Sequence, residues 1–327
     1  MAVLITGGAG YIGSVAAEQL LELGEPVVIL DNLSTGHRAA VPAGAEFIHG
    51  SVLDDSLLGK LLSDHGVDTV MHFAASSLVG ESCANPLKYF ENNVAGALSL
   101  LKAMRRANVE RIILSSTAAV YGNPDRVPIS EEMPDRPLNP YGLSKRMIEQ
   151  TLEWCDTAYG LRYVSLRYFN AAGATSQRGE DHRPETHLIP NVLDVAAGAR
   201  QSVTIFGNDY DTPDGTCVRD YIHVSDLTDA HVKAMHYLRE GGRSEIINLG
   251  NSVGHSVLQV VESARRVTGR EIPTVYSARR PGDADRLVAS SEKARSVLGW
   301  KPRKAAIDDI VSDAWEWRRR HPEGYPD

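Results

Sequence analysis

The chain has 327 residues, about the length of two average domains. Hydrophobic residues make up 43% of it and charged residues 23%, a balance typical of globular proteins and not of disordered chains. The formal net charge of -8 repels phosphate backbones, so we expect no nucleic-acid partner.

The cysteines and the apolar runs indicate a cytoplasmic protein. Cys83, Cys155 and Cys217 lie far apart and form no CxxC pair, which fits a reducing compartment. No apolar run approaches the ~18 residues of a membrane span, and no basic segment of a signal peptide precedes the first predicted strand. We therefore expect no membrane partner.

Short apolar runs and helical patterns alternate through the first half of the chain. Strands are predicted at 3–6, 27–30, 46–49, 69–73, 111–115 and 163–168, and helices at 13–23, 92–107 and 141–159. Such alternation implies right-handed crossovers and a parallel sheet covered on both faces. The predicted fold class is α/β: a doubly wound parallel sheet of the Rossmann type, with a second, smaller α/β domain.

The pattern changes after about Asn170. Residues 172–187 are rich in Gly, Thr, Arg, Asp and His without a clean period, which predicts a loop. Beyond it, helices are predicted at 188–199, 225–238, 256–268 and 305–320, and strands at 202–206 and 245–249. We expect a first domain over 1–170 and a second over 171–327, with part of 219–250 packing back on the first. The cleft between two docked domains is a usual place for a small molecule.

The glycine-rich sequence TGGAGYIG joins the first predicted strand to the first predicted helix. Gly7 and Gly8 permit a tight turn, Gly10 lets a pyrophosphate approach the backbone, and Gly13 allows close packing of helix on sheet. Asp31 follows 18 residues after Gly13, where a carboxylate binds the adenosine ribose and repels a 2′-phosphate. The segment therefore favours NAD over NADP. The alternative is a purely structural turn with a helix-capping aspartate.

Tyr141 and Lys145 form a Tyr-x-x-x-Lys pair at the start of a predicted helix. This spacing places both side chains on one face, where the ammonium stabilises phenolate and lowers the tyrosine pKa toward that of a general base. Ser115, Ser116 and Thr117 end the preceding strand, at the sheet edge where ligands bind. Alone, the pair is common on surface helices, and the hydroxyl residues could simply cap a strand.

These segments together resemble the extended short-chain dehydrogenase/reductase family of nucleotide-sugar enzymes, from Val3 to about Pro302. The resembling sequences are GGAGYIGS (7–14), DNLSTG (31–36), HFAA (72–75), VGES (79–82), SSTAAVYG (115–122), NPYGLSK (139–145), LRYFNAAGA (166–174) and FGNDYDTPDGTCVRDYIHVSDL (206–227). The last of them is the most typical of the epimerases in this family.

The resemblance implies an NAD-dependent epimerase that inverts C4 of UDP-hexoses through a transient 4-keto sugar. It implies Thr117, Tyr141 and Lys145 as catalytic residues, with Tyr141 as the base, and a homodimer formed through the helices at 92–107 and 141–159. The implied cofactor-binding residues are Gly7, Gly10, Tyr11, Ile12, Gly13, Asp31, Asn32, Ser34, Gly36, Ser51, Val52, Phe73, Ala74, Ala75, Asn92, Ser115, Tyr141, Lys145 and Tyr168. The implied UDP-sugar-binding residues are Thr117, Asn170, His187, Leu188, Thr204, Phe206, Arg219, Arg280, Asp283 and Leu287.

Three positions depart from the family pattern. Ser51 stands where relatives often have an aspartate that contacts the adenine, and Ser77 where some have a lysine that contacts the cofactor phosphates. Leu287 stands where some have a tyrosine beside the sugar pocket. The smaller leucine predicts a substrate range that extends to UDP-N-acetylhexosamines.

A histidine- and acid-rich segment could be imagined as a metal site. His182 and His187 lie near Asp181 and Glu185, but this spacing fits no helix face and the family needs no metal for this chemistry. We expect no metal.

Two other functions are compatible with parts of the pattern. One is a nucleotide-sugar 4,6-dehydratase, or a decarboxylase, on the same scaffold. Dehydratases typically have an Asp-Glu pair just after the catalytic threonine, where this chain has Ala118 and Ala119. The other is a non-catalytic NAD-binding regulator, against which the intact Thr117, Tyr141 and Lys145 argue.

Overall fold

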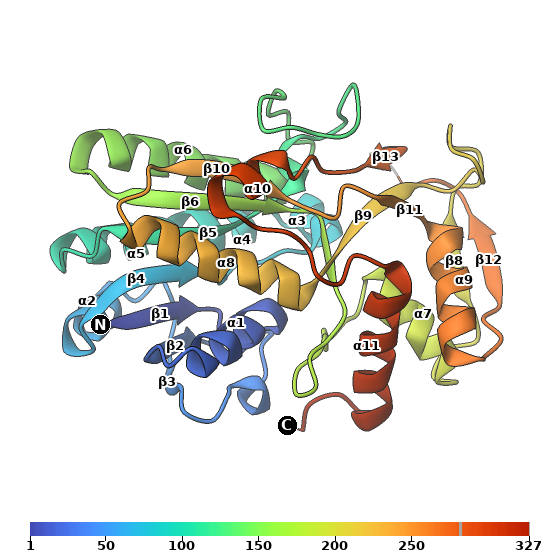
Figure 1. The fold of residues 1–327 in the computed structure, drawn as a ribbon, viewed down its shortest axis with the longest axis horizontal. Helices are drawn as coiled ribbons and strands as arrows, with labels where there is room; N and C mark the ends of the chain where they lie inside the picture. Colours follow the sequence, from blue (N-terminus) through green and yellow to red (C-terminus); the bar gives the residue numbers. More distant parts are fainter. Residues whose placement is uncertain (281–282, 327) are drawn as a thin grey trace.

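A seven-stranded parallel sheet forms the centre of the computed structural model, which describes residues 1–280 and 283–326 (Figure 1). Its order is β10-β6-β5-β4-β1-β2-β3, so the chain winds outward from β1 in one direction and from β4 in the other. The strands are β1 (Ala2–Thr6), β2 (Val27–Asp31), β3 (Glu46–His49), β4 (Val67–His72), β5 (Arg111–Thr117), β6 (Arg162–Tyr168) and β10 (Glu245–Leu249). The predicted doubly wound sheet is confirmed.

Helices cover both faces of this sheet. On one face α1 (Tyr11–Glu22) packs against α8 (Val224–Arg239), and on the other lie α2 (Asp55–Asp64), α5 (Gly96–Arg106) and α6 (Pro140–Tyr159). Val3 and Ile5 of β1 point to the first face and Leu4 to the second, and all three are fully buried. This double burial explains why the strands appear in the sequence as continuous apolar runs.

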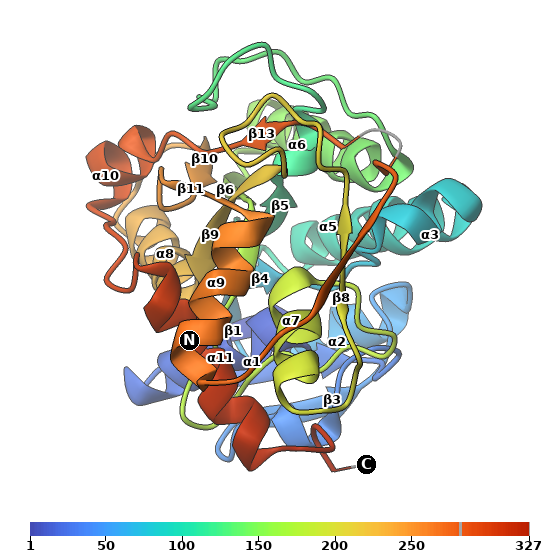
Figure 2. The same cartoon turned by 90° about the vertical axis from the view of Figure 1, so that its right-hand side faces the viewer.

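A smaller α/β unit lies beside the sheet (Figure 2). Its core is formed by α7 (Leu188–Ala196), α9 (Val257–Thr268) and α11 (Ile307–Arg320). They pack beside a four-stranded sheet of β7 (Asn170–Ala172), β9 (Val218–His223), β11 (Gly254–Ser256) and β13 (Arg286–Leu287), and beside the parallel pair β8 (Val203–Phe206) and β12 (Thr274–Ser277). The second, smaller α/β part of the fold is confirmed.

The chain returns to the large sheet after entering the smaller unit. Helix α8 packs against α1, and β10 pairs in parallel with β6 at the edge of the sheet. Helix α10 (Glu292–Leu298) then contacts α8 and β10. The two units therefore share interleaved segments, which fixes the position of one against the other. None of the helices in the described residues is both long and apolar enough to cross a lipid bilayer.

The helix predicted over 92–107 differs from the structure. Short helices α3 (Val79–Ala84) and α4 (Pro86–Tyr89) lead into a π-helical turn, η2 (Phe90–Ala95), and only then does α5 begin at Gly96. Periodicity did not reveal the turn because it depends on tertiary contacts of Asn93, described below. Elsewhere, α1 begins two residues before the predicted start, α7 ends three residues before the predicted end, and α2, β9 and α10 were not predicted.

Candidate active site

The glycine turn between β1 and α1 is shaped by contacts that leave no room for side chains. A Cβ on Gly7, which has φ +76°, would lie 2.6 Å from the Ala74 backbone nitrogen, and one on Gly13 would lie 2.2 Å from the Gly7 carbonyl oxygen. A Cβ on Gly10 would meet only that same carbonyl, at 3.4 Å, so the space above Gly10 is otherwise open. The turn is thus tightly packed at Gly7 and Gly13 and open at Gly10.

Helix α1 directs its first turn into that opening. Gly10 is its N-cap, and among the described residues no side chain caps it and no acidic residue occupies its first turn. The unpaired backbone N–H groups and the helix dipole there suit an anion such as a pyrophosphate. Asp31 accepts the backbone N–H groups of Ala9 at 3.0 Å and Leu33 at 2.8 Å, which places a carboxylate beside the turn. These features fit NAD.

The other residues predicted to bind the cofactor border the turn along the carboxyl edges of β2 to β6. A Cβ on Gly36 would contact Ala9, and Val52 contacts Gly96. The ring of Phe73 stacks on His231 at 4.7 Å between centroids. Hydrogen bonds join Ser34 with Asn32 after β2, Ser51 with Leu53 after β3, and Asn92 with Asn93 within η2.

Thr117, Tyr141 and Lys145 meet at the carboxyl end of β5. Thr117 is the last residue of the strand, and Tyr141 and Lys145 lie in the first turns of α6, whose N-cap Asn139 accepts the Gly142 N–H at 2.8 Å. Lys145 is buried and donates to the Ser115 carbonyl at 2.8 Å. The Ser115 hydroxyl in turn lies 2.8 Å from the Tyr168 hydroxyl. Strand and helix ends thus bring the predicted catalytic residues together.

The ionisation of Tyr141 differs from the expectation. Burial raises the pKa of Tyr141, and only the hydrogen bond with Thr117 acts in the opposite direction. Burial also lowers the pKa of Lys145 to about 8, against the opposing effect of the Glu149 carboxylate. Burial therefore dominates the pKa of Tyr141 in the protein by itself, and the predicted lowering of this pKa by Lys145 stays a prediction for the site with its ligands bound.

The residues predicted to bind a UDP-sugar are spread over several elements: β9 with its partners β7 and β13, the separate strand β8, the start of α7, the segment before β13 and, with Thr117, the end of β5. Arg219 donates to the carbonyl of Ala284 at 2.8 Å and lies 3.5 Å from a carboxylate oxygen of Asp283. The Arg280 guanidinium lies 3.9 Å from the centre of the Phe206 ring. Asn170 donates to the Asp220 carbonyl, and Leu287 of β13 lies opposite Arg219 of β9. Thr204 lies in β8. The N-terminus of α7 is formed by His187 and Leu188.

Two buried polar clusters support the catalytic helix and were not predicted. The Asn93 side chain accepts from the Ser76 N–H at 2.8 Å and donates to the Ser76 carbonyl and the Ser144 hydroxyl, each at 3.0 Å. Glu149, one turn after Lys145, accepts from Ser116 at 2.6 Å and binds Arg167 through both carboxylate oxygens, at 2.9 and 2.6 Å. Helical periodicity places these polar residues on an inward face of α6 or η2, which is the one signal that could have found them.

The loop after β7 brings together four side chains that the sequence suggested would not converge. Glu180, His182, Glu185 and His187 place one possible ligand atom each within 4.8 Å of one another. The argument from helical spacing fails because this segment is a folded loop. The acid that joins Glu185 in the cluster is Glu180, and not Asp181 as the sequence suggested. Burial alone would lower the pKa of His182, but the two carboxylates outweigh it and raise this pKa to about 9.

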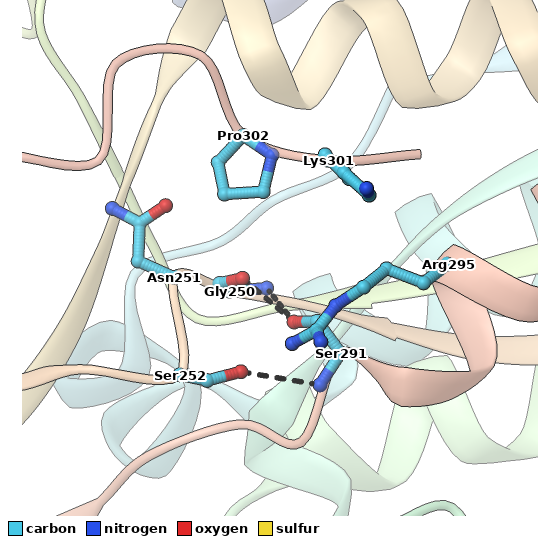
Figure 3. A pocket seen from close by; sticks show the side chains of 7 residues that line it. All are labelled: Gly250, Asn251, Ser252, Ser291, Arg295, Lys301 and Pro302. Carbon is cyan, nitrogen blue, oxygen red and sulfur yellow. Dashed lines mark hydrogen bonds between the residues drawn. The ribbon is translucent and has the colours of Figure 1, made fainter. Parts of the chain in front are cut away.

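A separate cavity of about 360 Å³ lies where the chain leaves β10 (Figure 3). Three of its lining residues bind one another: the Ser291 hydroxyl donates to the Gly250 carbonyl at 2.6 Å, and the Ser252 hydroxyl accepts from the Ser291 N–H at 3.3 Å. The lining residues are Gly250, Asn251, Ser252, Ser291, Arg295, Lys301 and Pro302. The cavity contains none of the predicted catalytic residues.

Known proteins with similar sequences and structures are epimerases. The model of the NAD dependent epimerase/dehydratase family matches residues 3–250. A UDP-glucose 4-epimerase of Streptococcus mutans is 54% identical over 331 residues, covering 100% of this chain and 99% of the relative. The crystal structure of the Brucella ovis UDP-glucose 4-epimerase in complex with NAD is 46% identical, with a TM-score of 0.94 and coverage of 96% and 97%.

A crystal structure of the Bifidobacterium longum UDP-glucose 4-epimerase in complex with NAD+ and UDP is also similar. It is 39% identical, has a TM-score of 0.94, and covers 99% of this chain and 100% of that chain. These matches span both the glycine turn and the smaller α/β unit. The chain therefore belongs to the NAD dependent epimerase/dehydratase family.

Proposed function

We propose that this chain is an NAD-dependent epimerase that inverts C4 of UDP-hexoses and interconverts UDP-galactose and UDP-glucose. The observation that carries the proposal is the meeting of Thr117, Tyr141 and Lys145 at the carboxyl edge of the sheet, beside a glycine turn that fits NAD. The UDP-glucose 4-epimerases that match over the full chain support the same activity.

The roles of the three residues follow from their positions. Bound NAD supplies the acceptor and the donor of the hydride that leaves C4 and returns to it. Tyr141 takes the proton of the 4-hydroxyl and later gives it back, while Thr117 hydrogen-bonds the same oxygen. Lys145 holds a positive charge within one helical turn of the phenol, which favours the phenolate once ligands complete the site. The 4-keto sugar turns between the two transfers.

The ligands divide between the two parts of the chain in this proposal. Residues 1–170 bind NAD through the glycine turn and Asp31, and residues 171–327 bind the UDP-sugar. Arg219 and Arg280 suit the diphosphate because guanidinium groups form charge-assisted hydrogen bonds to phosphate oxygens. Firm contacts to UDP leave the hexose free to rotate, which the reaction requires.

The proposal is tested by incubating the purified protein with UDP-galactose and no added NAD, and by identifying the product sugar. We expect UDP-glucose, and we expect the denatured protein to release NAD, identified by its mass. A 4-keto-6-deoxy sugar would indicate a dehydratase, but Ala118 and Ala119, in the 3₁₀ turn η3 (Ala118–Val120), offer no acid or base for it. Absence of any turnover with NAD bound would indicate a regulator.

We also propose a cytoplasmic homodimer formed through α5 and α6. Three large apolar side chains on one face of α6, Leu143, Met147 and Trp154, are exposed, and Trp154 retains 73% of its accessible surface. All three cysteines are unpaired, which suits a reducing compartment.

The dimer is tested by light scattering after gel filtration. We expect twice the chain mass of 35.6 kDa for the wild type, and the single-chain mass for Met147→Glu combined with Trp154→Glu. Tyr276→Glu, on exposed β12, is the control that should stay dimeric. A monomeric wild type would contradict the proposal.

A further inference from the structure

The chain that leads into α7 (Figure 1) forms a loop after β7. This loop carries two histidines and two glutamates, Glu180, His182, Glu185 and His187, here called the His–Glu cluster. The Nδ1 atom of His187 lies 2.9 Å from Oε1 of Glu180 and 2.8 Å from Oε1 of Glu185. The Nδ1 atom of His182 lies 3.2 Å from Oε1 of Glu180 and 3.6 Å from Oε2 of Glu185. The Nδ1 atom of each imidazole therefore faces both carboxylates.

Hydrogen bonds alone do not satisfy this arrangement. A ring nitrogen carries one proton and can donate it well to one acceptor, yet each Nδ1 has two carboxylate neighbours. The Nδ1 atom of His182 is buried and, among the described residues, makes no hydrogen bond of acceptable geometry, although Glu180 is within ion-pair distance. A cation that accepts an electron lone pair from each of the four side chains would satisfy the cluster.

The spacing of the four groups suits a small divalent cation. Ligand atoms about 2.0–2.2 Å from a tetrahedral zinc ion lie about 3.4 Å from one another. The four nitrogen–oxygen separations between the histidines and the glutamates run from 2.8 to 3.6 Å, with Glu185 turning a different carboxylate oxygen to each histidine. One possible ligand atom from each residue lies within 4.8 Å of the other three. Imidazole nitrogen with carboxylate oxygen is a ligand set that Zn²⁺ accepts. When the metal binds, the imidazoles release their protons to solvent, and two carboxylates with two neutral imidazoles then balance the charge of such an ion.

The surrounding backbone holds the ligands in place. Oε1 of Glu185 accepts the N–H groups of Thr186 and His187, each at 2.7 Å, which fixes the direction of its carboxylate. The Tyr325 hydroxyl accepts the N–H of Gly179 at 3.1 Å, next to Glu180. Such contacts around a metal site orient its ligands before the metal binds.

We propose that Glu180, His182, Glu185 and His187 form a structural site for one divalent transition-metal ion, with Zn²⁺ as the best match. Four protein ligands leave no open position, so the ion would fix the loop and take no part in catalysis. The site would join the loop to the start of α7, and the ring of His182 lies edge-on to Tyr11 of α1, 6.5 Å between centroids. The ion would thus brace the smaller unit against the glycine turn.

The test uses the full-length, tag-free chain, first freed of metal by dialysis against a chelator. Zn²⁺ is then titrated in competition with a coloured chelator, and bound zinc is counted after gel filtration. We expect one Zn²⁺ per chain, and a loss of affinity of at least about 100-fold in His182→Gln and in Glu180→Gln. The matched control is His65→Gln, because His65 forms an ordinary pair with Glu46 at 3.2 Å outside the cluster.

A second measurement does not depend on the variants folding. Co²⁺ bound to the wild-type chain should give the intense visible absorption of a tetrahedral site, and added Zn²⁺ should remove it. The proposal is overturned if the wild type binds no stoichiometric Zn²⁺, or if His182→Gln and Glu180→Gln bind it as tightly as the wild type. In either case the cluster consists of two imidazolium–carboxylate pairs.

Discussion

Under the proposed function, we expect turnover to depend most directly on the phenol of Tyr141. We expect Tyr141→Phe to fold and keep NAD but to lose activity on UDP-galactose by about 10²–10⁴-fold, the usual contribution of a general base. The variant lacks only a hydroxyl, and Lys145 keeps its bond to the Ser115 carbonyl, so the site should retain its shape. The measurement is kcat with quantification of bound NAD. Near-wild-type kcat would show that another group takes the proton.

That Thr117, Tyr141 and Lys145 come together was predictable at this scale, but the pKa shifts of Tyr141 and Lys145 were not. Tyr141, Lys145 and Thr117 stand in recognisable local patterns. The pKa values depend on how much water reaches each group, and burial is a property of the folded chain. Asn93 and Glu149 escaped prediction for the same reason, because an isolated Asn or Glu in a helix is usually solvated.

Leu287 is the residue on which the predicted acceptance of UDP-N-acetylhexosamines depends. It is half-buried beside Ala118, Val120 and Tyr121, so it already packs on the turn that follows the catalytic strand. Leu287→Tyr should add bulk there and selectively lower kcat/KM for UDP-N-acetylglucosamine, by about 10²-fold, relative to UDP-glucose. Both substrates are measured in wild type and variant. Equal losses on both, or a wild type inactive on the acetylated sugar, would rule out Leu287 as the determinant.

Most elements of the large sheet were predicted with useful accuracy because they are long or largely buried; β3 is the exception, short and without a buried residue. The strand predicted at 245–249 matches β10 at both ends, and the helix predicted at 141–159 matches α6 within one residue. The π-helical turn η2 was missed because its hydrogen-bond pattern is set by partners distant in sequence. Strand β9 was missed because its sequence, VRDYIH, shows neither a continuous apolar run nor a strict alternation.

The π-helical turn η2 is held to the catalytic helix through Asn93, which is fully buried. We expect Asn93→Ala to lower the free energy of unfolding by about 1–3 kcal/mol, because the N–H and carbonyl of Ser76 and the hydroxyl of Ser144 lose a partner. Denaturant unfolding of the variant and of the exposed control Asn123→Ala measures this. If both variants unfold at the wild-type denaturant concentration, Asn93 does not brace the turn.

The large sheet and the smaller α/β unit are joined because segments from the second half of the chain pack on the large sheet. Helix α8 belongs to the second half of the sequence but packs on the first sheet, and its residue His231 stacks on Phe73. His231 is fully buried, and its Nδ1 atom is hydrogen-bonded to the Leu227 carbonyl at 2.9 Å. Burial lowers the pKa of His231 to about 4, against the opposing hydrogen bond, so the folded protein keeps this ring neutral at physiological pH.

This neutral histidine makes the folded molecule sensitive to acid. The unfolded chain binds the proton with a pKa of about 6.5, so below that pH it takes up protons that the folded chain refuses, and stability falls until about pH 4. At pH 5 the loss from His231 alone is about 2 kcal/mol relative to pH 8.

His231→Leu should therefore lose less stability than the wild type between pH 8 and pH 5, by about that amount, in urea unfolding at the two pH values. The control is His236→Leu, at an exposed position of the same helix, which should keep the wild-type pH dependence. An unchanged pH dependence in His231→Leu would mean that the ring has the same pKa in the folded and unfolded chain, as it would if water reached it through the interface between α8 and the sheet.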